Sequence, residues 1–430
     1  ITNHPFSRSE ELLERALKTI PLGTQTFSKS RTQFPHGVSP FYAARAKGSQ
    51  LWDVDGNQFV DFANALCSVT LGYQDPDVDV AVRAQMDNGT IFSLPHEIEI
   101  DVAEKICELV PSAEMVRFGK NGSDATSGAV RLARAYTGRD RIAVCGYHGW
   151  QDWFIGSTAR NLGVPQAVRD LTHTFTYNDL NSLDALFKKH PGEFAGVIME
   201  PMNVTEPEPG FLEGVQALCK KHETVFILDE MITGFRFARG GAQELFGITP
   251  DLSTFGKGLA NGYPLSAIAG RADIMALMED VFFSFTMGGE TLSLAAAQAA
   301  LDKIVREPVI EQLNERGTRV VDGLRQRIVD HKVEHIFSVS GQPCWSFLVI
   351  NPAGAYTDWD IRTYLLQEMF ERRVLMLGTH TMSYAHTDAD VDKLLTAYDE
   401  ILPATRDAVA GGTLETRLRC EPLKPLFKVR

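Results

Sequence analysis

The residues best suited to catalysis in this sequence are Asp229 and Lys257, which lie 28 positions apart (257 minus 229). Asp229 ends the apolar run Phe226–Leu228, a pattern typical of a buried strand, and Lys257 lies in the glycine-rich stretch 255–262. Each residue alone has an ordinary explanation, because an acid after a strand often caps a helix and a lysine among glycines is usually solvated. The strand–helix–strand rhythm around the pair favours a joint role.

A carboxylate at a strand end and one amine suit an aromatic cofactor with two needs. The ring nitrogen of pyridoxal phosphate must stay protonated, and its aldehyde must be held covalently by an amine. Asp229 would face the ring nitrogen and favour its charged form. Lys257 would form the imine and, once released, move protons at the substrate Cα.

Three further segments follow predicted strands, where open α/β sheets bind their ligands. Residues 119–124 precede a predicted helix, so Gly122 and Ser123 could present N–H groups to a phosphate, or Ser123 or Asp124 could simply cap that helix. Tyr147 lies between glycines and could stack on a planar ring or pack on the sheet. Glu200 is another acid at the end of a strand.

Other kinds of site find little support in the sequence. His331 and His335 are four residues apart but have no third metal ligand nearby, so no metal site is expected. Asp55-Gly56 between two alternating runs predicts a hairpin rather than a calcium loop, because no glutamate closes the loop. Neither a Gly-x-Ser-x-Gly elbow nor a Gly-x-x-x-x-Gly-Lys-Ser/Thr loop occurs.

The length, composition and charge are those of a globular protein of two domains. The chain has 430 residues, 44% of them apolar, and 42 basic against 55 acidic residues give a net charge of −13. That sign disfavours nucleic-acid binding. The N-terminal stretch 1–20 reads as an amphipathic helix without a signal peptide, and no run is long enough for a membrane span. The six scattered cysteines are expected to be reduced, which favours the cytoplasm.

The order of predicted elements indicates an α/β fold. Helices expected over 125–136 and 183–189 alternate with strands expected over 141–145, 196–199, 225–228 and 265–269, which predicts a mainly parallel sheet. After a helix over 294–304, helices over 309–329 and 359–371 flank strands over 336–340 and 345–349. We therefore expect an N-terminal segment (1–60) that packs with the small domain, a large cofactor-binding domain (61–308) and a small α+β domain (309–430).

The sequence resembles the class III (subgroup II) aminotransferases, which are pyridoxal-phosphate enzymes of fold type I. Its motifs are most similar to those of the glutamate-1-semialdehyde aminomutase branch. The resemblance covers about residues 21–402. It rests on seven ordered segments, namely 52–57, 131–139, Tyr147-His-Gly149, Glu200-Pro201, 229–236, 249–252 and Gly256-Lys-Gly258.

The resemblance implies a role for each of several residues. Lys257 would be the lysine of the internal aldimine, Asp229 the partner of the pyridine nitrogen, and Tyr147 the residue stacked on the ring. It also implies a site in which Met231 packs on the opposite ring face, Gly122 and Ser123 hold the phosphate, and Glu200 belongs to the cofactor site. Thr286 would reach the phosphate of the neighbouring subunit, which implies a homodimer with composite active sites.

Four departures from the aminomutase pattern favour a different reaction. The stretch 24–31 has no arginine in register for the substrate carboxylate, and Gly378 stands where the aminomutase has a pocket glutamate. The segment between His148 and Tyr177 is shorter than the aminomutase's mobile loop. Finally, Gly289-Glu-Thr291 replaces the usual Gly-Asn-Pro.

The sequence thus predicts a transaminase that moves an amino group from an amino-acid donor, expected to be glutamate, to a ketone or aldehyde. A sugar-like or natural-product intermediate is the expected acceptor, with hydrogen bonds offered by His148, Gln151, Asn203 and Glu290. An aminomutase-type isomerase or a racemase on the same cofactor is the alternative. A cofactor-binding regulatory or scaffold protein is a third possibility, which the intact lysine–aspartate pair disfavours.

Overall fold

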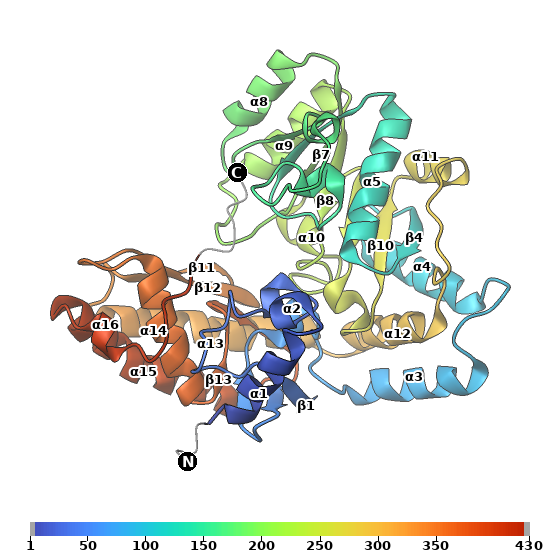
Figure 1. Cartoon of the computed structure of the whole chain (residues 1–430). Coiled ribbons are helices and arrows are strands. Elements are labelled where there is room, and N and C mark those ends of the chain that lie inside the picture. The colour runs from blue at the N-terminus through green and yellow to red at the C-terminus, as the bar shows by residue number, and fades with distance from the viewer. Residues whose placement is uncertain (1–4, 425–430) are drawn as a thin grey trace. The chain divides into compact units, whose positions relative to one another are not determined.

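The computed structural model describes residues 5–424, which divide into two compact units (Figure 1). Residues 76–310 form the unit that holds Asp229 and Lys257, and residues 5–75 with 311–424 form the other. Residues 61–75, which the sequence analysis places in the large domain, therefore belong with the N-terminal segment by their contacts. The first residues of the helix predicted over 1–20 lie outside the described residues. The same holds for the last residues of the predicted domain 309–430.

The larger unit is built around a seven-stranded sheet in the order β4-β10-β9-β8-β7-β5-β6. Four of the six neighbouring pairs are parallel, and β10 runs antiparallel to both β4 and β9. The mainly parallel sheet predicted from the sequence is thereby confirmed. Its strands are β4 (Met115–Gly119), β5 (Arg141–Cys145), β6 (Thr172–Thr174), β7 (Phe194–Met199), β8 (Val225–Asp229), β9 (Leu252–Phe255) and β10 (Ser266–Gly270).

Helices precede, link and follow these strands. They are α3 (Pro76–Asn88), α4 (Glu97–Leu109), α5 (Gly122–Thr137), α6 (Asp152–Ile155), α7 (Gln166–Arg169), α8 (Leu180–Lys189), α9 (Phe211–Lys221), α10 (Ala242–Phe246), α11 (Ala272–Met275) and α12 (Thr291–Arg306), with 3-10 turns η3 (Lys257–Ala260) and η4 (Ala276–Glu279). Parallel neighbours need such crossover connections, because the chain must return to the starting edge of the sheet.

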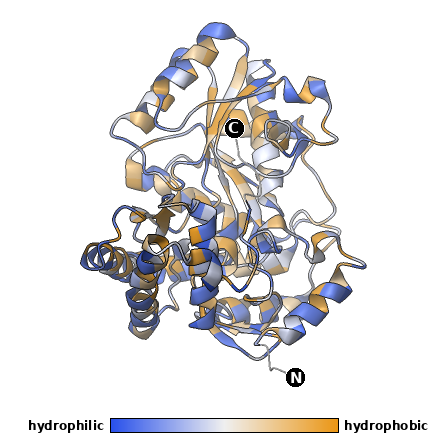
Figure 2. Ribbon diagram, turned by 60° about the vertical axis from the view of Figure 1, so that its left-hand side comes forward, coloured by the Kyte–Doolittle hydropathy of each residue, from blue (hydrophilic) through white to orange (hydrophobic). Residues whose placement is uncertain are grey.

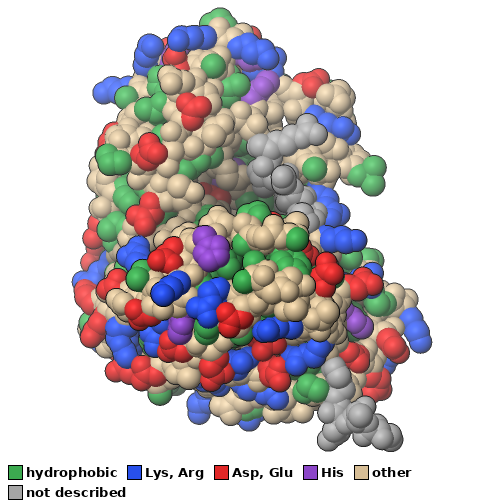
Figure 3. Space-filling view, turned by 90° about the vertical axis from the view of Figure 1, so that its left-hand side faces the viewer, with side chains coloured by type: hydrophobic (Ala, Val, Ile, Leu, Met, Phe, Trp, Pro, Cys, Tyr) green, Lys and Arg blue, Asp and Glu red, His purple; other side chains and the backbone are tan. Residues whose placement is uncertain are grey.

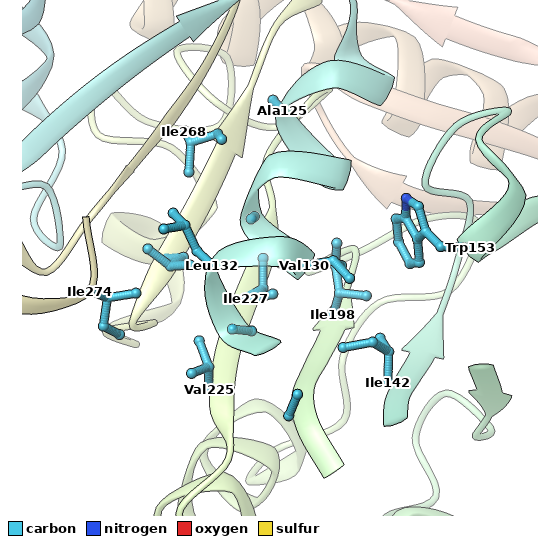
Figure 4. Close-up of a cluster of buried hydrophobic side chains, with 14 of the residues drawn as sticks. Ala125, Val130, Leu132, Ile142, Trp153, Ile198, Val225, Ile227, Ile268 and Ile274 are labelled. Atoms are coloured by element: carbon cyan, nitrogen blue, oxygen red, sulfur yellow. The ribbon is translucent and has the colours of Figure 1, made fainter. Parts of the chain in front are cut away.

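Alternation along the strands assigns each buried side chain to one face of this sheet. In β8, Val225 and Ile227 join the cluster beneath α5, whereas Phe226 and Leu228 join the cluster beneath α8 and α9. Figure 4 shows side chains of α5 meeting those of the strands, and Figure 2 shows that the central strands are largely hydrophobic. Each large apolar side chain buried in this way contributes about 1.5–3 kcal/mol.

The other unit contains two small antiparallel-rich sheets with helices. Its elements are α1 (Ser7–Ala16), η1 (Pro21–Gly23), η2 (Phe27–Lys29), β1 (Ala43–Lys47), β2 (Gln50–Asp53), β3 (Gln58–Asp61), the left-handed turn α2 (Asn64–Cys67), α13 (Val309–Asp330), β11 (Phe337–Gln342), β12 (Trp345–Ile350), α14 (Asp358–Glu371), β13 (Val374–Leu375), β14 (Thr379–Thr381), α15 (Asp388–Ala410) and α16 (Leu414–Arg417). The predicted hairpin at Asp55-Gly56 is confirmed by the antiparallel pair β2–β3.

The surface and the thiols add three observations. On the face shown in Figure 3, acidic and basic side chains are interspersed. Among the described helices, none combines the length and apolar character that crossing a bilayer requires. Across residues 5–424, no three His, Cys, Asp or Glu side chains gather as a metal site would need, and all six cysteines carry free thiols.

Candidate active site

Asp229 is the last residue of β8, and the strand fixes the direction in which its side chain points. Side chains alternate along a strand, so Asp229 points to the same face as Val225 and Ile227, the face that α5 covers. The residue is 3% exposed, which makes it a buried acid at the carboxyl end of a parallel strand. A ligand held at the N-terminus of α5 would therefore lie on the same side of the sheet as this carboxylate.

The carboxylate of Asp229 is held by three donors. Oδ2 lies 2.7 Å from Nδ1 of His148, and Oδ1 accepts from the backbone N–H of Met231 (3.1 Å) and from the hydroxyl of Thr254 (3.3 Å). A carboxylate has about four acceptor positions. One position is thus left for an N–H donor such as a protonated ring nitrogen.

His148 is fixed by its second nitrogen as well. Nε2 lies 3.1 Å from the carbonyl oxygen of Cys145, so each ring nitrogen has a polar neighbour. The imidazole packs between Trp153 and Phe154, and its side chain is fully buried. His148 is therefore a positioning partner of Asp229, a role that the sequence analysis missed when it assigned this residue to the substrate.

Tyr147 lies in the turn that follows β5. The residue is 48% exposed and meets Phe154 edge to face, with 5.5 Å between ring centroids, so part of its aromatic surface remains accessible to a ligand. Gly146 and Gly149 flank it with φ of +104° and +107°, a backbone conformation that favours glycine. Burial first, and then the charges of Asp229 and Glu200, raise the pKa of the Tyr147 phenol.

Gly122 and Ser123 are the first two residues of α5, so the helix begins earlier than the sequence predicted. Asn121 precedes the helix, and its backbone N–H donates to the carboxylate of Asp124 at 2.7 Å. Backbone N–H groups in the first turn of a helix have no intrahelical partner, and the helix dipole favours an anion there. The cap is therefore not Ser123, whose hydroxyl instead accepts from the backbone of Trp150 at 3.2 Å.

Met231 connects this helix start to the lysine. A Cβ placed on Gly122 would come within 2.9 Å of the Met231 sulfur, and one placed on Gly256 would come within 2.7 Å of it. Lys257 follows Gly256 directly, with φ of +42°, and no hydrogen bond of its amine occurs within the described residues. Strained backbone of this kind in a non-glycine residue costs about 1–3 kcal/mol and is concentrated at functional sites.

Glu200 supports the Tyr147 turn and borders a cavity. Its Oε2 accepts from the backbone of Tyr147 and from the amide of Asn203, both at 3.0 Å. Burial first, and then the charge of Asp229, raise the pKa of this carboxyl, while burial and Glu200 raise the pKa of the Cys145 thiol to about 12. The cavity of about 340 Å³ lies at the carboxyl ends of β5, β6 and β7 and is lined by Val144, Cys145, Gly146, Tyr147, Thr174, Phe175, Thr176, Tyr177, Glu200 and Asn203.

Thr286 lies apart from this cluster, in an exposed turn at 286–289 that precedes α12. Glu290, which the sequence analysis offered to the substrate, caps α12 and forms an ion pair with Lys120. Gln151 precedes α6 and Asn203 contacts Glu200. The structure thus brings together Gly122, Ser123, Tyr147, Glu200, Asp229, Met231 and Lys257, and it leaves Thr286 on the surface.

These residues fit pyridoxal phosphate. The first turn of α5 offers N–H groups to a phosphate, and Asp229 has one acceptor position open for the ring nitrogen. Glycines at 122, 149 and 256 allow the site to pack closely, because a Cβ at 122 or 256 would overlap the Met231 sulfur and one at 149 the hydroxyl of Ser123.

The protein matches known relatives along most of its length. The sequence is 41% identical to a glutamate-1-semialdehyde 2,1-aminomutase of Syntrophobacter fumaroxidans over 74% of this chain and 77% of that protein. It is 34% identical to a 3-aminobutyryl-CoA aminotransferase of Cloacimonas acidaminovorans over 92% of this chain and 97% of that protein.

Solved structures show the same fold. The FumI protein of Sphingopyxis sp. MTA144, solved in its PLP internal aldimine form, superposes with a TM-score of 0.86 at 30% identity, covering 96% of this chain and 98% of that one. An omega-transaminase of Sphaerobacter thermophilus gives a TM-score of 0.84 at 27% identity, over 93% and 98% of the two chains. The model of the aminotransferase class-III family matches residues 33–380. This chain is therefore a pyridoxal-phosphate-dependent enzyme of the class-III aminotransferase family, with fold type I.

Proposed function

We propose that this enzyme is a transaminase that moves an amino group from an amino-acid donor, with glutamate as the expected donor, to a ketone or aldehyde. The observation that carries the proposal is the Asp229 carboxylate, which three donors fix while one acceptor position stays open. A buried acid arranged in this way holds the ring nitrogen of the cofactor protonated. Pyridoxal phosphate, when bound, supplies an electron-accepting ring that stabilises negative charge at the substrate Cα.

Each residue of the cluster then has a task. The N–H groups of Gly122 and Ser123 would bind the phosphate, Tyr147 and Met231 would hold the ring, and Glu200 fixes the Tyr147 turn. Lys257 would hold the aldehyde of the cofactor, and its amine, once released, would move protons at the substrate Cα. His148 holds Asp229 in place.

We further propose that the enzyme works as a homodimer. Thr286 lies in an exposed turn, so a second copy of the chain can reach it. Its hydroxyl would then contact the cofactor phosphate of the partner subunit. The free thiols are consistent with a reducing compartment, and the cytoplasm is the proposed location.

The cavity beside Tyr147 supports a hydroxylated acceptor. No lysine, arginine or histidine is among its lining residues, so a second carboxylate or a phosphate of the substrate would find no cationic partner there. Of the two Glu200 oxygens, only Oε2 has a hydrogen bond among the described residues, and the amide oxygen of Asn203 has none. Oε1 of Glu200 and the amide oxygen of Asn203 can therefore accept hydrogen bonds from a ligand. Together with the hydroxyls of the two lining threonines, they suit the hydroxyl groups of a sugar-like carbonyl compound.

Replacing Asn203 by leucine should selectively weaken hydroxylated acceptors. We expect kcat/KM for a polyhydroxylated aldehyde to fall about tenfold, the effect of one lost hydrogen bond together with an unpaired group. The kcat/KM for an unsubstituted aldehyde of equal chain length should stay unchanged. Steady-state rates with such matched pairs measure this, and Thr205→Val on the same loop serves as the control. An equal loss for both aldehydes would contradict the assignment of the cavity.

An isomerase is the second candidate, because a relative at 41% identity is named an aminomutase. One structural observation weighs against it. Gly378 has φ of +85°, and a Cβ there would lie 3.0 Å from a guanidinium nitrogen of Arg362. A pocket glutamate at this position would need a strained backbone that costs about 1–3 kcal/mol.

Mixing the purified enzyme with glutamate separates the two candidates. A transaminase completes its first half-reaction without an acceptor, so we expect close to one equivalent of 2-oxoglutarate per active site, together with a change in the visible absorbance of the cofactor. An isomerase returns the amino group to the same carbon skeleton and releases no 2-oxo acid. Rapid-quench assay of 2-oxoglutarate measures the yield, and a substoichiometric trace would favour the isomerase.

A further inference from the structure

Lys120 and Glu290 form an ion pair between two segments far apart in the sequence. The Lys120 amine lies 2.7 Å from Oε2 of Glu290, 170 positions away, and the two side chains are only 15% and 13% exposed. Lys120 belongs to the turn that leads from β4 into α5, and Glu290 precedes α12. The pair therefore ties the phosphate-binding turn to the start of another helix.

Glu290 is itself firmly held. It caps α12, because Oε1 accepts from the backbone of Leu292 at 2.7 Å and Oε2 accepts from the backbone (3.3 Å) and hydroxyl (2.7 Å) of Ser293. Burial opposes ionisation of this carboxyl, but hydrogen bonds from Lys120, Ser293 and Leu292 outweigh it and lower its pKa. Glu290 is thus a charged, anchored end of the pair.

Beyond Lys120, the first turn of α5 is tied to the segment after β5, because Ser123 accepts from the backbone of Trp150. The backbone N–H groups of Lys120 and Asn121 donate to Asp124, which closes the turn on its own helix at 3.0 and 2.7 Å. Glycines stand on either side, at 119 and 122, and glycine has the greatest backbone freedom of all residues. The side chain of Lys120 is the contact that joins this turn to a helix outside it.

We propose that Lys120 and Glu290 are positioning residues for the cofactor phosphate, a role that rests on the proposed cofactor site at Gly122 and Ser123. The pair holds the turn so that the free N–H groups at the start of α5 converge on the phosphate. It acts by geometry, because an ion pair adds no net charge to the site. Lys120 does not itself bind the phosphate.

The direction in which Glu290→Gln changes the affinity for the cofactor separates this role from a direct charge effect. If Lys120 attracted the phosphate, Glu290→Gln would release the cation and tighten binding. If the pair is a positioning device, Glu290→Gln loosens the turn and weakens binding. Lys120→Met weakens binding in either case.

The test compares pyridoxal phosphate with pyridoxal, which has the same ring and aldehyde but no phosphate. Full-length apoprotein is titrated with each compound by absorbance, and covalent capture at Lys257 is measured after borohydride reduction. We expect Lys120→Met and Glu290→Gln each to weaken pyridoxal phosphate about tenfold, the effect of one charge-assisted hydrogen bond. The double variant should be no weaker than the worse single variant, and pyridoxal should bind as before.

Two control variants keep the result decisive. Lys105→Met removes a lysine of the same unit that pairs with Glu108 and Asp302, and it should leave both affinities unchanged. Lys120→Arg keeps the ion pair and should retain the affinity for pyridoxal phosphate. Thermal unfolding of each apoprotein shows which variants are folded.

Three outcomes would overturn the inference: unchanged affinity for pyridoxal phosphate, an equal loss for both compounds, or tighter binding by Glu290→Gln. Wild-type protein that captures neither compound at Lys257 would instead refute the proposed cofactor site.

Discussion

Replacing Lys257 by alanine should abolish turnover and remove all cofactor that borohydride can trap on the protein. The amine is the proposed covalent anchor and proton carrier, and a general acid–base group of this kind contributes about 10²–10⁴-fold to a rate. Its amine has no ion pair in the described part of the chain, so its loss should disturb the fold little. Mass spectrometry after borohydride reduction measures the trapped cofactor, and steady-state assays measure the rate.

Lys105→Ala is the matched control for this variant, since it removes a lysine of the same unit outside the site. It should keep both the trapped cofactor and the activity. A small primary amine added to Lys257→Ala should restore part of the proton transfer. Trapped cofactor that persists on another lysine of the alanine variant would show that Lys257 has been assigned wrongly.

Replacing Asp229 by asparagine should leave the cofactor bound but lower kcat by about 10²–10³-fold, the usual loss when one preorganised electrostatic group is removed. An amide cannot hold the ring nitrogen protonated, so the ring becomes a poor acceptor of electrons from Cα. The hydrogen bonds to Met231 and Thr254 can persist through the amide oxygen. Stopped-flow measurement of the glutamate half-reaction gives the rate of the step concerned.

Glu230→Gln is the control beside it, because Glu230 is a buried acid at the next position. Its carboxylate accepts from Thr233, Ala242 and Gln243, so it fastens the following turn rather than the cofactor. This variant should unfold at a lower temperature while it keeps the cofactor absorbance of the wild type. If Asp229→Asn retained a near-normal rate, another acid would have to face the ring.

The sequence predicted the mainly parallel sheet and the position of Asp229 at the end of one of its strands, for a physical reason. The apolar run before Asp229 and the helices between strands are local patterns, and the period of two along β8 fixes the direction of that carboxylate. The identity of the family follows from ordered motifs, which the comparisons confirm.

Contacts between distant segments could not be predicted in the same way. Neither the His148–Asp229 pair, 81 positions apart, nor the Lys120–Glu290 pair has a periodic signal in the sequence. Both histidine and glutamate looked like substrate ligands because their types suit hydrogen bonding. A partial signal existed for Glu290, since an acid three residues before Ser293 at the start of a predicted helix is typical of a cap.

The sheet face on which Asp229 lies has a consequence for how such enzymes diversify. One residue inserted into or deleted from β8 would turn the carboxylate toward α8 and α9, and with the role proposed for Asp229 this shift would end catalysis. Asn203, by contrast, lies on a connecting segment that tolerates changes in length and sequence. With the proposed acceptor site, substitutions in that segment would change the acceptor while the Asp229 carboxylate stays in place.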